Sequence, residues 1–376
     1  MTEVELAAVL AAAAVACVWP GTFLVLRRMA LTADAIGHTL LFGIVVAFFL
    51  VGDLDSPFLL VGAALTGLAT VLIVETLQRG PRMRADAAIG LTFPFLFALA
   101  VILVSVGARN IHLDIDAVLV GQPEYALLPR WHLGEIPITP LMILIAVASL
   151  NFVLGLLFYK ELKLTTFDPE LARVLGYSPA VVHYGLMAMV SWTAVAVFDA
   201  VGPVLVVGYF VLPATTALLL SLRLKRVLLW GVGVGVAGSL IGTWAAVRWD
   251  ANAAGSVAAA LGVLLLAAFL YSPHRGWLIH LWQHRQQQRL LEETMVLVHL
   301  YQHEGTAAEV TEAAVSDLPQ HLDWSPRRLE RVLERLYRKQ WVVLHQANLL
   351  RLTSAGRRQA QSVYGTIRAE ASTPAF

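Results

Sequence analysis

The chain has 376 residues, of which 58% are hydrophobic and only 14% are charged, and its mean hydropathy is +0.70. This composition is too apolar for a soluble domain, and the chain is too long for a single membrane anchor, so a polytopic membrane protein is predicted. The net charge of +1 does not indicate an anionic partner. The single cysteine excludes a disulfide scaffold and a cysteine-rich metal cluster.

Charge divides the chain into two parts. Residues 1–273 contain 30 Asp, Glu, Lys and Arg residues, whereas the 103 residues of 274–376 contain 23. A membrane domain needs long stretches without charge, and a water-exposed domain needs a charged surface. We therefore expect a transmembrane domain over 1–273 and a soluble tail over 274–376.

Apolar stretches long enough to cross the bilayer recur through the first part. A membrane helix needs about 20 apolar residues to cross about 30 Å of hydrocarbon. Candidate spans lie at 6–26, 35–52, 58–77, 87–107, 136–159, 184–200, 201–222, 227–247 and 254–271. The expected fold is an all-α membrane domain of nine helices. Because the break at 199–203 is short, eight or ten spans also fit the sequence.

Basic residues in the loops predict the orientation of these spans. One alternating set of loops contains 11 Lys and Arg residues and the other set contains 3. Because cytoplasmic loops are enriched in Lys and Arg, the richer set and the tail should face the cytoplasm. The spans are then expected to be surrounded by lipid, with the N-terminus outside.

The tail has the pattern of a small winged helix. A helix is expected over 283–303 and another from Ser325 and Pro326, followed by two short strands at 341–344 and 349–352. The polar face of the Ser325 helix carries residues suited to nucleic-acid or partner contact: Arg327, Arg328, Arg331 and Arg335. The tail as a whole has 13 basic and 10 acidic residues, which argues against nucleic acid as its partner.

Two histidine pairs in the tail are spaced four residues apart. They are His280 with His284 and His299 with His303. This spacing places two imidazoles on one helix face, where they can share a metal ion. Solvated side chains explain the same pattern, so both interpretations stay open.

The most informative membrane residues are Asp34 and His38. They lie four residues apart near the start of the second span, so on a helix both side chains can reach one cation. Ionisable residues at such positions are costly and often mark a transport path. In the alternative interpretation, Asp34 caps the helix and pairs with Arg27 or Arg28, while His38 bonds a neighbouring helix. Two ligands do not complete a zinc or manganese site, but a symmetric dimer would supply four.

A short helix is predicted in an inner loop. Asp168 is suited to its N-cap, Pro169 to its first turn and Gly176 to its end. A helix of two turns is only marginally stable alone in water, so its apolar side chains need another surface to pack against. Either this helix docks another protein or it is an ordinary loop helix.

Several motifs together resemble the membrane permeases of ABC importers for manganese, zinc and iron. The resemblance covers about residues 5–276 and rests on these segments: Arg28-Met29-Ala30-Leu31 through Asp34-Ala35 to His38, Asp86-Ala87-Ala88-Ile89-Gly90, Phe167-Asp168-Pro169-Glu170-Leu171-Ala172, Val201-Gly202-Pro203-Val204-Leu205-Val206-Val207, Leu212-Pro213-Ala214-Thr215-Thr216-Ala217 and Ser272-Pro273-His274-Arg275-Gly276.

The resemblance implies a permease dimer in a bacterial plasma membrane, of identical or paralogous chains, that moves a divalent transition metal ion. It also implies a separate cytoplasmic ATPase bound through residues 167–176 and an extracytoplasmic protein that delivers the metal. Asp34 and His38 match the metal ligands of that family, and Asp199, at the outer end of the sixth span, is a further candidate for the ion path. No permanently bound cofactor is expected.

Sequence motifs for catalysis are absent. The chain has neither the Gly-rich phosphate loop of ATPases nor a His-Glu-x-x-His segment, so a non-enzymatic transport subunit is expected. Two rivals remain: an ion-coupled secondary carrier, and a membrane-tethered regulator whose residues 278–370 bind DNA.

Overall fold

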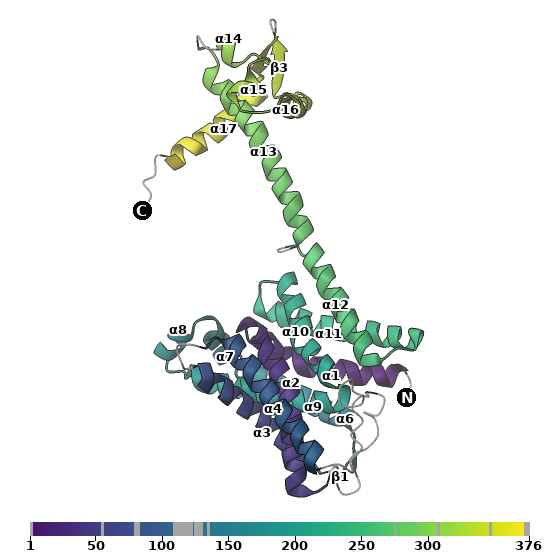
Figure 1. Ribbon diagram of the computed structural model, residues 1–376. Coiled ribbons are helices and arrows are strands. Elements are labelled where there is room, and N and C mark those ends of the chain that lie inside the picture. The colour runs from purple at the N-terminus through teal and green to yellow at the C-terminus, as the bar shows by residue number, and fades with distance from the viewer. Residues whose placement is uncertain are drawn as a thin grey trace. The chain divides into compact units, whose positions relative to one another are not determined.

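The computed structural model describes residues 3–53, 56–78, 83–107, 123, 131–133, 136–273, 276–306, 309–345 and 348–371. It separates into two compact units, Met1–Trp277 and Leu278–Phe376. The elements of the first unit are α1 (Glu3–Leu26), α2 (Ala30–Val51), α3 (Phe58–Gln78), α4 (Ala85–Gly107), β1 (Trp131–Leu133), β2 (Ile136–Ile138), α6 (Pro140–Leu157), α7 (Tyr159–Phe167), α8 (Pro169–Val174), α9 (Pro179–Val201), α10 (Pro203–Leu220), α11 (Leu224–Trp249) and α12 (Ala253–Tyr271) (Figure 1).

Nine helices in the described part of the chain are long and apolar enough to cross a membrane. They are α1, α2, α3, α4, α6, α9, α10, α11 and α12, and each overlaps one of the predicted spans. The short break at 199–203, which left the number of spans open in the sequence, separates two helices. Gly202 adopts φ +83° between the end of α9 and Pro203, the first residue of α10. The prediction of a polytopic, mainly helical membrane domain is confirmed. The span expected from residue 136 starts later, at Pro140, because Ile136–Ile138 form strand β2, which pairs with β1.

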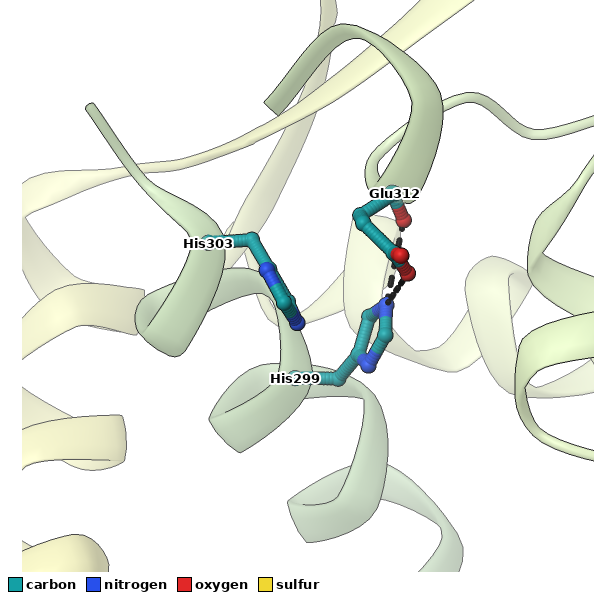
Figure 2. Close-up of side chains that lie close together, drawn as sticks. All are labelled: His299, His303 and Glu312. Carbon is teal, nitrogen blue, oxygen red and sulfur yellow. Dashed lines mark hydrogen bonds and ion pairs between the residues drawn. The ribbon is translucent and has the colours of Figure 1, made fainter. Parts of the chain in front are cut away.

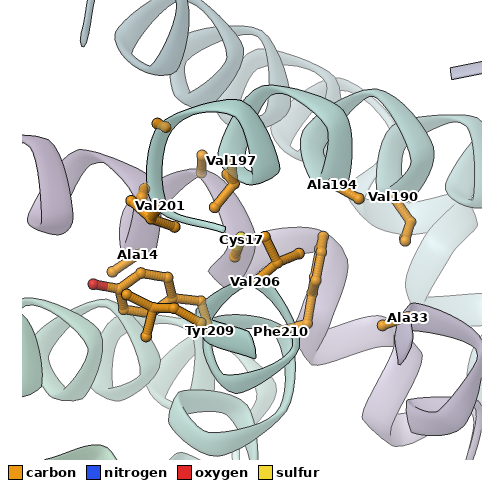
Figure 3. Close-up of a cluster of buried hydrophobic side chains, with 14 of the residues drawn as sticks. Ala14, Cys17, Ala33, Val190, Ala194, Val197, Val201, Val206, Tyr209 and Phe210 are labelled. Carbon is orange, nitrogen blue, oxygen red and sulfur yellow. The ribbon is translucent and has the colours of Figure 1, made fainter. Parts of the chain in front are cut away.

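Helices α1, α9 and α10 supply the centre of the membrane domain. Their small and β-branched side chains interdigitate around Cys17 of α1, Val197 of α9 and Phe210 of α10, all fully or almost fully buried (Figure 3). Tyr209 is the largest fully buried side chain, and its hydroxyl lies 2.8 Å from the hydroxyl of Ser239, which donates to the Leu10 carbonyl. The core therefore fixes the start of α2, because Ala33 packs at its edge.

Glycines let α11 approach two neighbouring helices closely. A Cβ on Gly235 would lie 3.1 Å from the Ala14 Cβ on α1, and a Cβ on Gly242 would lie 2.3 Å from the Val257 Cα on α12. Gly231 and Gly238 extend the same two contacts. In lipid, where apolar burial gives helices little drive to associate, this close packing is a main source of stability.

Gly242→Ala is therefore expected to destabilise the membrane domain, because the α12 backbone must move away. Overpacking of this kind costs about 1–3 kcal/mol. Gly233→Ala on the same helix is the matched control, since nothing lies within 4 Å of its added methyl group. Thermal unfolding in detergent should show a lower midpoint for Gly242→Ala only. Equal midpoints for the two variants would contradict the packing argument.

The second unit contains most of α13 (Trp277–His303), then α14 (Glu309–Glu312), α15 (Leu318–His321), α16 (Pro326–Arg338), β3 (Val342–His345), β4 (Leu349–Leu352) and α17 (Ser354–Ala371). Its core is formed by Leu300, Leu318, Val332, Leu336 and Leu350, among others. Strands β3 and β4 form the expected antiparallel pair, and Ala314 adds a bridge to Leu349. The tail is thus a small winged-helix-like unit with its own apolar core.

Candidate functional site

A tight turn joins α1 to α2 and determines where the candidate ligands lie. Arg28 takes the left-handed conformation, with φ +60°. Its N–H donates to the Val25 carbonyl and the Met29 N–H to the Leu24 carbonyl, so the end of α1 is closed by a Schellman motif. Helix α2 begins directly afterwards at Ala30.

Asp34 and His38 lie on consecutive turns of α2. Nε2 of His38 is 3.4 Å from Oδ1 of Asp34, so a nitrogen and an oxygen ligand face the same small volume. The alternative in which Asp34 caps the helix is wrong, because α2 begins at Ala30 after Met29, and Asp34 is already in its second turn. Arg27 also does not pair with Asp34: its guanidinium is bound by residues of α7 and α9.

The pair occupies the open face of an otherwise covered helix. Most residues of the first turns of α2 are buried, whereas Leu31 is exposed and the side chains of Asp34 and His38 are 37% and 38% exposed. Two aromatic rings of α4 pack against the imidazole of His38. The Phe93 ring stacks on it, with ring centroids 5.5 Å apart, and the Phe97 ring meets it edge-on, with centroids 6.4 Å apart. Contacts within this chain therefore orient the His38 side chain, and the Asp34–His38 pair stays partly exposed on the open face of α2.

A polar network that the sequence did not predict lies next to the start of α2. The Arg27 guanidinium donates to the hydroxyls of Thr165 (2.9 Å) and Thr166 (3.1 Å) in the last turn of α7, and it lies 3.4 Å from Nδ1 of His183 in α9. Glu75 of α3 contacts Nε2 of His183 with one carboxylate oxygen and accepts from the Tyr184 hydroxyl with the other. This network connects four elements that are distant in the sequence.

A cavity of about 360 Å³ adjoins this network. It is lined by Arg27, Thr32, Glu75, Asp86 and His183, among other residues. Glu75 and His183 gave a signal that could have identified them: each is an ionisable residue at the end of a membrane span, and such residues are functional candidates by default. Their meeting was not predictable, because they are 108 residues apart.

The inner-loop helix is present as predicted. Helix α8 spans Pro169–Val174, and the Asp168 carboxylate accepts a hydrogen bond from the Leu171 N–H at 2.9 Å. Gly176 ends it with φ +85° in a second Schellman motif, in which the Tyr177 N–H donates to the Ala172 carbonyl.

The surface of α8 is unusually apolar for a water-exposed helix. Ala172 is buried, but Phe167, Leu171, Val174 and Leu175 are exposed, with Val174 at 83%. Glu170 pairs with Arg173 at 2.6 Å on the same helix. The described residues of the membrane domain leave these apolar side chains exposed, so contact of α8 with a partner stays a prediction beside the ordinary loop helix.

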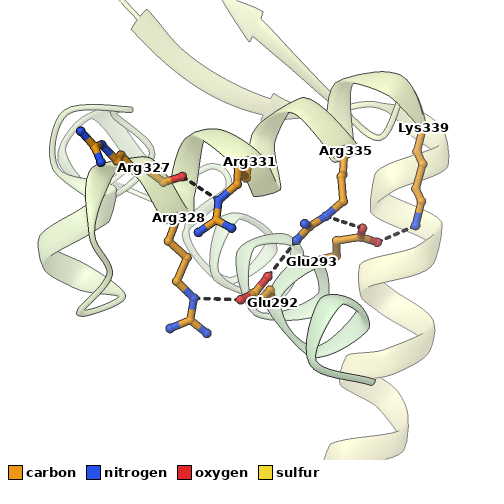
Figure 4. Close-up of polar contacts among 7 residues, drawn as sticks. All are labelled: Glu292, Glu293, Arg327, Arg328, Arg331, Arg335 and Lys339. Carbon is orange, nitrogen blue, oxygen red and sulfur yellow. Dashed lines mark hydrogen bonds and ion pairs between the residues drawn. The ribbon is translucent and has the colours of Figure 1, made fainter. Parts of the chain in front are cut away.

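Two of the tail arginines proposed for nucleic-acid or partner contact are engaged within the tail. Arg328 and Arg335 each lie 2.8 Å from a carboxylate oxygen of Glu292 on α13, and Arg335 and Lys339 also pair with the buried Glu293 (Figure 4). Burial opposes ionisation of Glu292, but hydrogen bonds from the two arginines hold its pKa below the usual value.

The remaining members of the basic set lie on the outer side of the same helix. Arg331 donates to the Arg327 carbonyl. A carboxylate pair beneath the basic face lowers its positive potential, which weakens phosphate binding.

Other predicted positions are only partly described. Asp199 lies in the last turn of α9, close to the end of that helix at Val201, and its role in an ion path stays a prediction. Four of the arginines counted for orientation lie outside the described residues: Arg79, Arg82, Arg109 and Arg130.

Comparison with known proteins agrees with this architecture. Residues 1–272 match the family model described as the ABC 3 transport family. The chain is 39% identical to the zinc transport system membrane protein TroD of Treponema pallidum over 362 aligned residues. This alignment covers 96% of this chain and 98% of TroD. It is 43% identical over 267 residues to the manganese transport system membrane protein MntD of Bacillus subtilis, which covers 70% of this chain and 89% of MntD.

A solved structure shares the fold. The structure described as PsaBC from Streptococcus pneumoniae in complex with Fab superposes with a TM-score of 0.61 at 26% identity, covering 73% of this chain and 93% of that chain. The structure and the comparisons agree. Nine helices in the described residues are suited to cross a membrane, the family model covers the whole membrane domain, and TroD aligns over 98% of its own length. This chain is therefore a multi-pass membrane permease of the ABC 3 transport family.

Proposed function

We propose that this chain is the permease subunit of an ABC importer that moves a divalent transition metal ion into the cytoplasm. The relatives are named for zinc and manganese transport, and the donor atoms on α2 suit both ions. One observation carries the proposal: a carboxylate and an imidazole lie 3.4 Å apart on the accessible face of a membrane-spanning helix. A charged pair at that depth is costly unless it binds an ion or a partner.

Two ligands from one chain do not complete a coordination sphere. Zinc in proteins takes four ligands, and manganese takes more. A second permease chain related by a two-fold axis, either a copy of this chain or a paralogue, would bring a matching pair to the same axis. The open face of α2 at Leu31, Asp34 and His38 supports this arrangement, because a face that met lipid would not expose a carboxylate.

Energy would come from a separate ATPase subunit, because the sequence of this chain has no phosphate-binding loop. Helix α8 provides an exposed apolar surface for it on the side with the basic loops. An extracytoplasmic metal-binding protein would deliver the ion to the opposite side. The metal is cargo bound in passing, and no permanently bound cofactor is proposed for the transport path.

Reconstitution tests this function against its rivals. Proteoliposomes containing the permease and its ATPase, with ATP on the ATPase side, should accumulate radioactive manganese or zinc when the delivery protein is present. ATP omission should abolish accumulation. Uptake by the permease alone, driven only by an ion gradient, would contradict the proposal and favour a secondary carrier. A tethered DNA-binding regulator would transport nothing under either condition.

A further inference from the structure

The tail brings three metal-ligating side chains together at a place remote in sequence from Asp34 and His38. His299 and His303 lie one turn apart on α13, and Glu312 lies at the end of α14 (Figure 2). One ligand atom from each residue lies within 4.8 Å of the other two. The helical spacing predicted that the two imidazoles share a face, but the carboxylate comes from a separate helix.

The distances are close to those that a bound ion requires. Zinc–nitrogen and zinc–oxygen bonds of about 2.1 Å place tetrahedral ligand atoms roughly 3.4 Å apart. Nε2 of His299 is already 3.5 Å from Oε2 of Glu312. The rings of His299 and His303 have centroids 4.8 Å apart, so a small side-chain rotation brings their nitrogens to one ion.

A fourth ligand is within reach. His321, at the end of α15, has its Nδ1 atom 3.1 Å from Oε2 of Glu312, and its ring stacks on that of His299 with centroids 6.0 Å apart. Three imidazoles and one carboxylate form a four-ligand set of mixed nitrogen and oxygen donors. Such a set suits a divalent first-row transition metal ion of the zinc type and not calcium or magnesium, which prefer oxygen ligands.

The core of the tail holds these ligands in place. Leu300 on α13, Ala313 next to Glu312, and Leu318 on α15 are all buried. The segment after α14 is fixed further, because the Leu350 N–H donates to the Ala313 carbonyl. Rigid backbone beneath each ligand reduces the cost of ordering the site on binding.

We propose that the tail binds one divalent transition metal ion of the zinc type through His299, His303 and Glu312, with His321 as the fourth ligand. This site is separate from the proposed transport path and does not depend on it. Because the distribution of basic residues in the loops predicts a cytoplasmic tail, the site would be in contact with the cytoplasmic metal pool.

The test measures metal binding without transport. The full chain is purified in detergent with Asp34→Asn and His38→Gln as background, so that the transport pair does not contribute, and is titrated with zinc against a chromophoric chelator. One equivalent of zinc should bind. His303→Gln or Glu312→Gln in this background should remove that equivalent, or weaken it by about 100-fold, since even an outer-shell partner is worth about 10–100-fold in affinity. His345→Gln is the matched control, because His345 is exposed on β3.

A second measurement separates loss of ligands from loss of folding. Cobalt bound to mixed nitrogen and oxygen ligands in a tetrahedral site absorbs visible light, so the background protein should develop this band and His303→Gln should not. Without metal, both proteins should unfold at the same temperature, and zinc should raise the midpoint only in the background protein. Unchanged zinc stoichiometry in both ligand variants would overturn the proposal, as would equal loss in His345→Gln.

Discussion

Replacement of Asp34 by Asn, or of His38 by Gln, is expected to reduce ATP-dependent metal uptake by at least about 100-fold. Loss of an outer-shell group already weakens metal sites by about 10–100-fold, and these residues are the proposed ligands themselves. In a two-fold assembly of identical chains each substitution removes two ligands at once, so the effect should exceed that of a single ligand loss. Uptake of radioactive manganese or zinc in proteoliposomes measures it.

Folding controls for these variants are available in the same chain. Both substitutions preserve side-chain size, and both side chains are partly exposed, so the packing of α2 should survive. Asp250→Asn is a suitable control for loss of a carboxylate, because Asp250 ends α11 in the left-handed conformation that asparagine tolerates well. The variants should elute as intact protein and retain the ATPase. Near-normal uptake in both would remove Asp34 and His38 from the path.

The surroundings of His38 explain why uptake is expected to need both proposed ligands. Phe93 and Phe97 restrict the imidazole of His38, and its Nε2 atom lies 3.4 Å from Oδ1 of Asp34. An imidazole alone would offer a bound divalent ion one nitrogen and no negative charge. In the proposed site the carboxylate would lower the electrostatic cost of moving the ion into the bilayer, and the imidazole would favour transition metals.

Length and apolar composition were sufficient to predict the spans, but not where they begin. Helix α2 starts at Ala30, although the apolar stretch was expected from residue 35, and α9 starts at Pro179 instead of 184. In both cases polar residues of the first turns lower the hydropathy while the helix continues. Those early turns contain Asp34 in α2 and His183 in α9, so a search by hydropathy alone left out the turns that carry candidate site residues.

Local patterns predicted the pairs that depend on helical spacing, and long-range meetings could not be predicted. Asp34 with His38 and the cap of α8 follow from spacing within one segment. The contacts of Arg27 with Thr165 and of His183 with Glu75 join residues more than 100 positions apart. Glu312 is only 13 positions from His299, but it also meets the tail histidines from a different helix. Only the packed core determines which distant polar residues meet.

Substitution of Val174 or Leu171 by Asp is expected to release the ATPase. These residues form the exposed apolar surface of α8, and the loss of a central apolar anchor costs an interface roughly 2 kcal/mol or more, which is about 30-fold in affinity. Co-purification of the ATPase measures this. Leu222→Asp is the matched control, because Leu222 is also exposed on a loop with basic residues but lies outside α8.

A second substitution can distinguish the binding of the ATPase at α8 from the transmission of its movement to α2. Helix α8 follows directly after α7, whose Thr165 and Thr166 accept hydrogen bonds from Arg27 at the turn that leads into α2. A displacement of α8 by a docked ATPase would therefore be transmitted through the Arg27 guanidinium to the turn before α2, the helix that carries Asp34. Arg27→Gln should keep the ATPase bound but lower the amount of metal moved per ATP hydrolysed, whereas Val174→Asp should abolish binding. If Arg27→Gln transported normally per ATP, force would have to reach α2 through other contacts, such as the packing of α3 and α9 against it.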